Sequence, residues 1–187
     1  MRLVVYGDFN CPFSALASAR VADLEQRGMA EVDWRAVQHD TSISSSGELI
    51  PEYRRRDFER ELDQIRNLLV IGEPDRLRLP ERRANTRIAN EAFAATPLSL
   101  RPAVREEFFS AYWADGDDLS DARLVDRIAG RPRDRRTADG WQHRWMSLPR
   151  PTVPAMVLPD GYISRGLGAL ARLALLLDGT HQEATAW

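Results

Sequence analysis

The amino-acid sequence predicts an α/β fold, and three observations carry this prediction. The first part of the chain, to about residue 37, reads as strand, helix and strand. A long stretch with helical periodicity fills the middle of the chain, and the last part reads as two short strands and an apolar helix. A chain of 187 residues with 43% apolar residues can bury a real core, and this composition argues against disorder.

The first unit is predicted to be a βαβ unit. Residues 3–6 form an apolar run that is long enough for a buried strand and too short for a helix, and residues 7–10 form a turn. Pro12 suits the first position of a helix, and Gly28 ends that helix as a C-terminal cap. Residues 32–37 then predict a second strand, parallel to the first with a right-handed crossover.

The middle of the chain is predicted to be helical, after a Ser-rich connection at residues 41–47. Apolar residues recur there at helical spacing: Phe58, Leu62, Ile65 and Leu69; Ile88, Ala92 and Ala95; Val104, Phe108 and Tyr112; and Leu124, Val125 and Ile128. The last of these groups predicts a short final helix before the Arg-rich residues 131–136. No segment of this region alternates as a strand does, so we expect no strand in it.

The final unit is predicted to be a β-hairpin followed by a helix. Residues 155–158 and 162–164 are apolar runs on either side of a Pro-Asp-Gly turn. Residues 166–177 then form an apolar helix.

Charge and hydropathy exclude several classes of partner. The net charge is −2, and no block of one sign is long enough to mark a nucleic-acid or membrane surface. No signal peptide is visible, and no run reaches the roughly 18 apolar residues of a membrane span. We therefore expect a cytoplasmic, reducing setting, without nucleic-acid or membrane partners, in which a lone thiol stays free.

The candidate site is centred on Cys11, the single cysteine of the chain. It lies where the first strand ends and the first helix begins, and reaction sites of open α/β sheets gather at such places. The helix amides favour an anion there, so we expect the pKa of the thiol to fall below its ordinary value of about 8.5. Ser14, one turn further on, can donate a hydrogen bond to the same sulfur. The alternative is that Cys11 is an inert, buried packing residue.

Other residues are candidates for the walls of the same site. His39 follows the second strand, at the same sheet edge as Cys11, and could act as an acid or base, although a surface loop histidine is the simpler interpretation. Phe13 is expected to line the cleft mouth. The run Arg54-Arg55-Arg56 reads mainly as a solvated helix face, with an anion clamp over the cleft as the alternative.

No metal site is expected. One cysteine and three scattered histidines lack the spacing of metal ligands, so we interpret His143 and His181 as structural.

Two short motifs make the sequence resemble a known family. Cys-Pro-Phe-Ser at residues 11–14 and Thr-Val-Pro at residues 152–154, in this order around a helical insert, resemble the DsbA family of thioredoxin-fold proteins. The resemblance is greatest to its FrnE-like branch, whose relatives include 2-hydroxychromene-2-carboxylate isomerase and kappa-class glutathione transferase. The segments ANTRIANEAF (84–93) and EEFFSAYWADGDDLSD (106–121) also resemble family segments. The resemblance implies a thioredoxin fold interrupted by an all-helical insertion, with residues 1–48 and 149–187 in the thioredoxin-like domain and 49–148 in the insert.

The resemblance also implies roles for particular residues. Cys11 occupies the position of the reacting group, followed by Pro12. Pro154 corresponds to a cis-proline whose loop lies beside the sulfur, with the backbone of Val153 free to pair with a bound thiol or peptide. Ser14 is the departure, because FrnE-like oxidants usually carry a second cysteine there, whereas the isomerase and kappa branches usually carry serine at the first position. Without a resolving thiol, a mixed disulfide at Cys11 must be released by an external thiol.

These observations lead to one expected function and two alternatives. The expected function is thiol–disulfide exchange on a low-molecular-weight thiol or a protein mixed disulfide, with Cys11 as nucleophile and Ser14 as stabiliser of the thiolate. The second is a thiol-dependent isomerase or transferase, in which Cys11 or Ser14 holds a cofactor thiol. The third is a non-catalytic binding relative. We expect no tightly bound cofactor, glutathione or another small thiol as co-substrate, and a homodimer as one option for assembly.

Overall fold

The centre of the protein is a four-stranded mixed sheet. The computed structural model describes residues 1–70, 73 and 75–178. Strands β1 (Arg2–Gly7), β2 (Glu31–Ala36), β5 (Ala155–Val157) and β6 (Ile163–Arg165) lie in the order β2-β1-β5-β6. Strand β2 pairs with β1 in parallel, from Arg2 opposite Glu31 to Gly7 opposite Ala36, whereas β5 and β6 are antiparallel to their neighbours. The predicted α/β class and the parallel first unit are confirmed.

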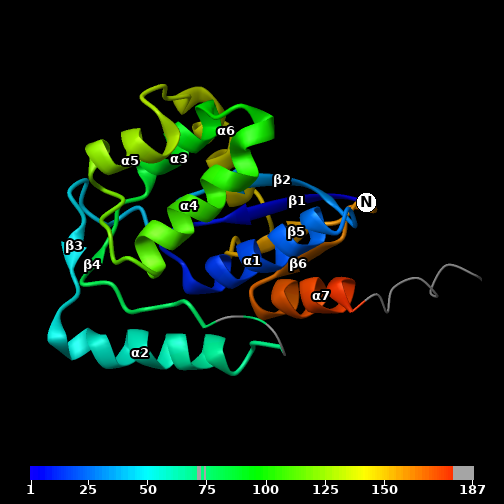
Figure 1. The fold of residues 1–187 in the computed structure, drawn as a ribbon, viewed down its shortest axis with the longest axis horizontal. Helices are drawn as coiled ribbons and strands as arrows, with labels where there is room; N and C mark the ends of the chain where they lie inside the picture. The colour runs from blue at the N-terminus through cyan, green and yellow to red at the C-terminus, as the bar shows by residue number, and fades with distance from the viewer. Residues whose placement is uncertain (71–72, 74, 179–187) are drawn as a thin grey trace, which may run out of the picture.

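Helices surround this sheet (Figure 1). Helix α1 (Pro12–Gln26) connects β1 to β2 and packs against the last helix, α7 (Leu167–Leu177). The remaining helices are α2 (Glu52–Arg66), α3 (Arg87–Ala95), the 3-10 turn η1 (Leu98–Leu100), α4 (Arg101–Trp113), α5 (Ala122–Ala129) and α6 (Arg135–Met146). Helix α4 packs on α1, while α3 and α6 pack against each other and against β2. Figure 1 shows α2 along the opposite edge of the molecule from α3, α5 and α6.

The core is continuous from the sheet into the helical region. The cluster of buried apolar residues includes Leu3 and Val5 of β1 together with residues of α3 and α4. Phe9, directly after β1, joins the two parts, since its ring centroid lies 4.8 Å from that of Phe108 and 5.8 Å from that of Phe93. This packing fixes the short loop that leads to Cys11. The division into a thioredoxin-like domain and an insert at residues 49–148 stays a prediction.

Two features of the helical region differ from the sequence prediction. Strands β3 (Glu48–Leu49) and β4 (Arg82–Arg83) form a short antiparallel pair where no strand was expected. They were missed because two residues are too few to show alternation.

Helix α6 begins inside the Arg-rich segment, after the helix that was predicted to be the last of the region. Asp134 caps it by accepting a hydrogen bond from the Thr137 N–H at 3.0 Å. Its buried face consists of Ala138, Trp141 and Trp145, and the charged residues between them hide this stripe in the sequence.

Among the described residues, no helix combines the length and apolar character needed to cross a membrane.

Candidate active site

Cys11 is the N-cap residue of α1, and its position is fixed from both sides. Its backbone N–H donates to the carbonyl oxygen of Asp8 at 3.1 Å, which closes the turn after β1. Pro12 occupies the first helical position, where its missing N–H costs nothing. The indole N–H of Trp113 donates to the Phe9 carbonyl oxygen at 2.9 Å and ties the same turn to α4. Cys11 as a whole residue is 7% exposed.

The thiol of Cys11 is held in its neutral form. Burial raises the pKa of Cys11 to about 11, and the negative charge of Asp8 adds to this effect. Hydrogen bonds from the side chain and backbone of Ser14 and from the Phe13 backbone act in the opposite direction and are outweighed. The expectation that the helix terminus lowers the pKa of this thiol is therefore wrong. The sequence shows the helix terminus but not the burial that opposes it.

This result changes the expected reactivity of the thiol. Alkylation of Cys11 by iodoacetamide in the folded protein should accelerate with pH up to about 11, because only the thiolate reacts. In the unfolded protein the same titration should centre near 8.5, the approximate value of a free cysteine. The measurement is the initial rate of labelling against pH, with mass spectrometry to assign the adduct. A folded-state midpoint below that of the unfolded chain would contradict the buried, neutral thiol.

Behind the thiol lies a buried carboxylate, Asp8, which is 0% exposed. Its Oδ2 accepts from the backbone N–H of His39 at 2.8 Å and lies 2.7 Å from the same residue's Nδ1. Its Oδ1 accepts from the Thr86 hydroxyl at 2.7 Å and from the Asn10 N–H at 3.3 Å. Asp8 thus connects β1, the end of β2 and the start of α3. Its own backbone N–H donates to the Ser14 hydroxyl at 3.3 Å, so Ser14 is tied to the same residue.

His39 and Asp8 form a histidine–carboxylate pair at the edge of the sheet. Burial alone would lower the pKa of His39, but the hydrogen bond and charge of Asp8, with the charge of Asp40, outweigh it and raise the pKa. Asp8 engages Nδ1, so the ring nitrogen that is not held by Asp8 is Nε2. The sequence reasoning found His39 but missed Asp8, which was read only as a turn residue. The sequence did contain a signal for Asp8, because a carboxylate directly follows a predicted buried strand.

Cys11 and His39 open into one cleft with a volume of about 560 Å³. The candidate residues that line it are Cys11, Pro12, Phe13, His39 and Val153. Ser14, which is 0% exposed, and Pro154, which is buried directly before β5, do not line the cleft. The Val153–Pro154 peptide bond is cis.

The cleft also has a wall that the sequence reasoning only partly foresaw. Helix α2 contributes Arg54, Phe58, Glu61 and Leu62, at spacings that place them on one face. Arg54 was considered as an anion clamp, whereas Glu61 was not considered. Asn10 also lines the cleft, and its buried Oδ1 has no hydrogen-bond partner among the described residues.

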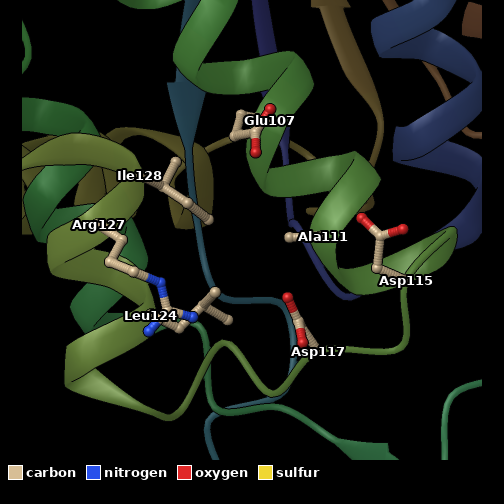
Figure 2. Close-up of a pocket in the computed structure, with 7 residues that line it drawn as sticks. All are labelled: Glu107, Ala111, Asp115, Asp117, Leu124, Arg127 and Ile128. Carbon is tan, nitrogen blue, oxygen red and sulfur yellow. The ribbon is translucent and has the colours of Figure 1, made fainter.

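A second hollow, of about 360 Å³, lies between α4 and α5 (Figure 2). Figure 2 shows the carboxylates of Glu107, Asp115 and Asp117 and the guanidinium of Arg127 around it. It shares no lining residue with the cleft and contains no cysteine or histidine. We assign no chemistry to it.

No metal centre is visible in the part of the chain that the structure describes. No group of three or more His, Cys, Asp or Glu side chains there could hold a metal ion. His181 lies outside the described residues.

The family model of the DSBA-like thioredoxin domain matches residues 2–131, which is most of the chain. The chain belongs to this DSBA-like thioredoxin family. The matched residues include the Cys-Pro-Phe-Ser motif but end before Val153 and Pro154. The predicted family and the thioredoxin fold with its helices are therefore confirmed.

Solved structures agree with this fold. A 2-hydroxychromene-2-carboxylate isomerase is 21% identical, with a TM-score of 0.67 over 96% of this chain and 94% of the isomerase. A probable DsbA oxidoreductase from Streptomyces coelicolor is 18% identical, with a TM-score of 0.69 over 100% of this chain and 92% of the other. At these identities the similarity shows the fold alone. No curated protein matches the sequence.

Proposed function

We propose that this DSBA-like protein catalyses thiol–disulfide exchange through Cys11, on a low-molecular-weight thiol or a protein mixed disulfide. The observation that carries the proposal is the position of the chain's single cysteine, at the head of α1 and in the wall of a cleft shared with His39 and Val153. A cleft of this size accommodates a small thiol or an extended peptide segment.

The reaction runs in two exchanges. The Cys11 thiol loses its proton, and its thiolate attacks one sulfur of a bound disulfide, so that a Cys11 mixed disulfide forms and a thiolate leaves. A thiolate from solution then attacks the substrate sulfur of this mixed disulfide and releases the Cys11 thiolate. In the net reaction one thiol enters the disulfide and another leaves it, so the numbers of thiols and disulfides stay the same and the protein is not oxidised.

A neutral thiol needs a base for the first exchange, and His39 supplies it. Asp8 holds the imidazole through Nδ1, so the other ring nitrogen is directed to proton exchange in the cleft. Ser14 then stabilises the thiolate that forms, since its side chain and backbone already lower the pKa of Cys11.

Val153, Pro12 and Phe13 position the substrate in the cleft. The backbone of Val153, next to the cis bond, makes no hydrogen bond among the described residues and is free to pair with an extended substrate. Pro12 and Phe13 supply an apolar surface beside the sulfur. Glutathione or another small thiol serves as co-substrate, without a tightly bound cofactor, in a cytoplasmic setting that maintains such thiols.

The second candidate function is a thiol-dependent isomerase or transferase. The raised pKa of Cys11 favours it, because a thiol that stays protonated can donate a hydrogen bond to the thiolate of a bound co-substrate without forming a disulfide. In this case Cys11 holds the co-substrate and makes no covalent bond to it.

A Ser14→Cys variant tests the exchange mechanism directly. Incubation of the wild-type protein with a small disulfide such as 2,2′-dithiodipyridine should leave one stable adduct on Cys11, released only when an external thiol is added. In the variant, the new thiol one helical turn away should expel the adduct and leave an intramolecular disulfide.

Mass spectrometry of the intact protein distinguishes these states. Ser18→Cys, also buried in α1 but one further turn from Cys11, is the matched control and should retain the adduct. A wild-type protein that never forms the adduct would contradict the exchange function and favour the second candidate. A Ser14→Cys protein that keeps its adduct would contradict the proposed geometry of the motif.

A further inference from the structure

One face of α2 carries two unpaired charges into the cleft. Arg54 and Glu61 lie seven residues apart, which is two helical turns, so they share a face with Phe58 between them. Both charged residues line the same cleft as Cys11. The proposed exchange reaction uses neither of them.

Arg54 forms no salt bridge with an acidic side chain among the described residues, although it lines the cleft. Its guanidinium carbon lies 5.3 Å from the centre of the Phe58 ring, and no carboxylate pairs with it. Three of the other four arginines of α2 are paired: Arg55 with Glu52, Arg60 with Asp57, and Arg66 with Asp63 and Asp75. The fourth, Arg56, forms no ion pair among the described residues either, but it does not line the cleft. The stacking on Phe58 orients the Arg54 guanidinium without satisfying its hydrogen-bond donors.

Glu61 is the unpaired anion on the same face of α2. Its side chain is half-buried, and within the described part of the chain it makes no hydrogen bond or ion pair. Burial, assisted by Asp57, raises the pKa of Glu61, although the cations His39, Arg54 and Arg83 act against this. A cation bound beside this carboxylate would offset its desolvation.

The other arginine that lines the cleft is paired with carboxylates, unlike Arg54. Arg83 pairs with Asp40 and lies 3.8 Å from Glu48, so its charge is already balanced by the protein. The uncompensated charges of the α2 wall are therefore one cation and one anion, about 10 Å apart along the helix axis.

We propose that this face of α2 is a recognition subsite for a thiol that carries both a carboxylate, bound by Arg54, and an ammonium group, bound by Glu61. The inference rests on the proposed exchange at Cys11 and names the substrate class of that site. An extended dipeptide spans about 7 Å, which matches two charges held by long side chains two turns apart. The ligand class is therefore a short zwitterionic peptide thiol.

The test uses Cys11 labelled with a neutral thiopyridyl group and four matched thiols. The thiols are cysteinylglycine, its C-terminal amide, its N-acetyl derivative, and the derivative with both modifications, which carry both charges, only the ammonium, only the carboxylate, or neither. The measurement is the rate at which each thiol releases pyridine-2-thione from the protein. Each rate is divided by that of the same thiol with free 2,2′-dithiodipyridine, which removes differences in thiol reactivity.

We expect the zwitterionic thiol to be about tenfold faster than the uncharged one after this correction, which is the product of a roughly threefold gain from each of the two charged contacts. Arg54→Met should remove the advantage that a carboxylate gives, and Glu61→Gln the advantage that an ammonium gives, while the uncharged thiol stays unchanged. Arg56→Met and Glu59→Gln, on the same helix but outside the lining of the cleft, are the matched controls and should alter none of the four rates.

Equal corrected rates for all four thiols would overturn the subsite while leaving exchange at Cys11 intact. An equal loss for all four thiols in either α2 variant would also overturn it, since that pattern indicates a damaged cleft. Failure of every thiol to release the label would instead contradict the proposed function.

Discussion

Replacing Cys11 with serine should abolish thiol–disulfide exchange, with a loss of at least about 1,000-fold in rate. The chain has no other cysteine, so no second sulfur can take over the reaction. The serine hydroxyl is too weak a nucleophile and cannot form a mixed disulfide. Because Cys11 is small and its replacement differs by a single atom, the fold should be retained. The measurement is the turnover of a mixed disulfide between glutathione and a small chromogenic thiol, with circular dichroism to check the fold.

A Cys11→Ala variant separates the two candidate functions. Under the exchange mechanism, Cys11→Ser and Cys11→Ala are equally inactive, because both lack the sulfur atom that forms the mixed disulfide. Under the isomerase or transferase mechanism, serine still donates a hydrogen bond to a bound thiolate, whereas alanine does not. If the turnover survives in Cys11→Ser but is lost in Cys11→Ala, the exchange mechanism is rejected.

The sequence predicted the position of the thiol well because that position follows from local rules. A short apolar strand, a turn and Pro12 place Cys11 at the head of a helix, and the parallel β1–β2 pair places His39 at the same sheet edge. The order of the two family motifs around the helical insert led to the correct family.

The sequence failed where the outcome depends on tertiary burial. The direction of the pKa shift of Cys11 was predicted wrongly, because desolvation by burial is its largest cause and depends on tertiary packing. The cleft of Cys11 is lined in part by residues distant in sequence, such as Tyr112 and Trp113. Asp8 was missed because a turn aspartate and a buried aspartate look identical in a sequence. Its partner Thr86 is 78 residues away. Glu61 was hidden in a charged helix whose other members are mostly solvated.

The second large effect is expected on stability, from replacement of the buried carboxylate of Asp8. Asp8→Asn should lower the free energy of unfolding by about 3 kcal/mol, because a fully buried acceptor of several hydrogen bonds is replaced by a group with one acceptor oxygen. Whichever way the new amide is oriented, its NH₂ group meets donors at His39 or at Asn10. Asp115→Asn is the control, since this exposed aspartate makes no side-chain hydrogen bond among the described residues and should cost less than about 0.5 kcal/mol.

The same variant should change the pH dependence of stability, and the direction follows from His39. The folded state raises the pKa of His39 above its unfolded value, largely through Asp8, so the stabilisation is fully present below about pH 6.5 and is lost as pH rises through the folded pKa. Urea denaturation at about pH 5.5 and about pH 8 should therefore show a larger deficit of Asp8→Asn at the lower pH. Loss of the Asp8 charge should also lower the pKa of Cys11 from about 11, so that alkylation becomes faster at neutral pH although the protein is less stable. A deficit that is equal at both pH values, together with an unchanged alkylation profile, would show that Asp8 supports the loop without acting on either His39 or the thiol.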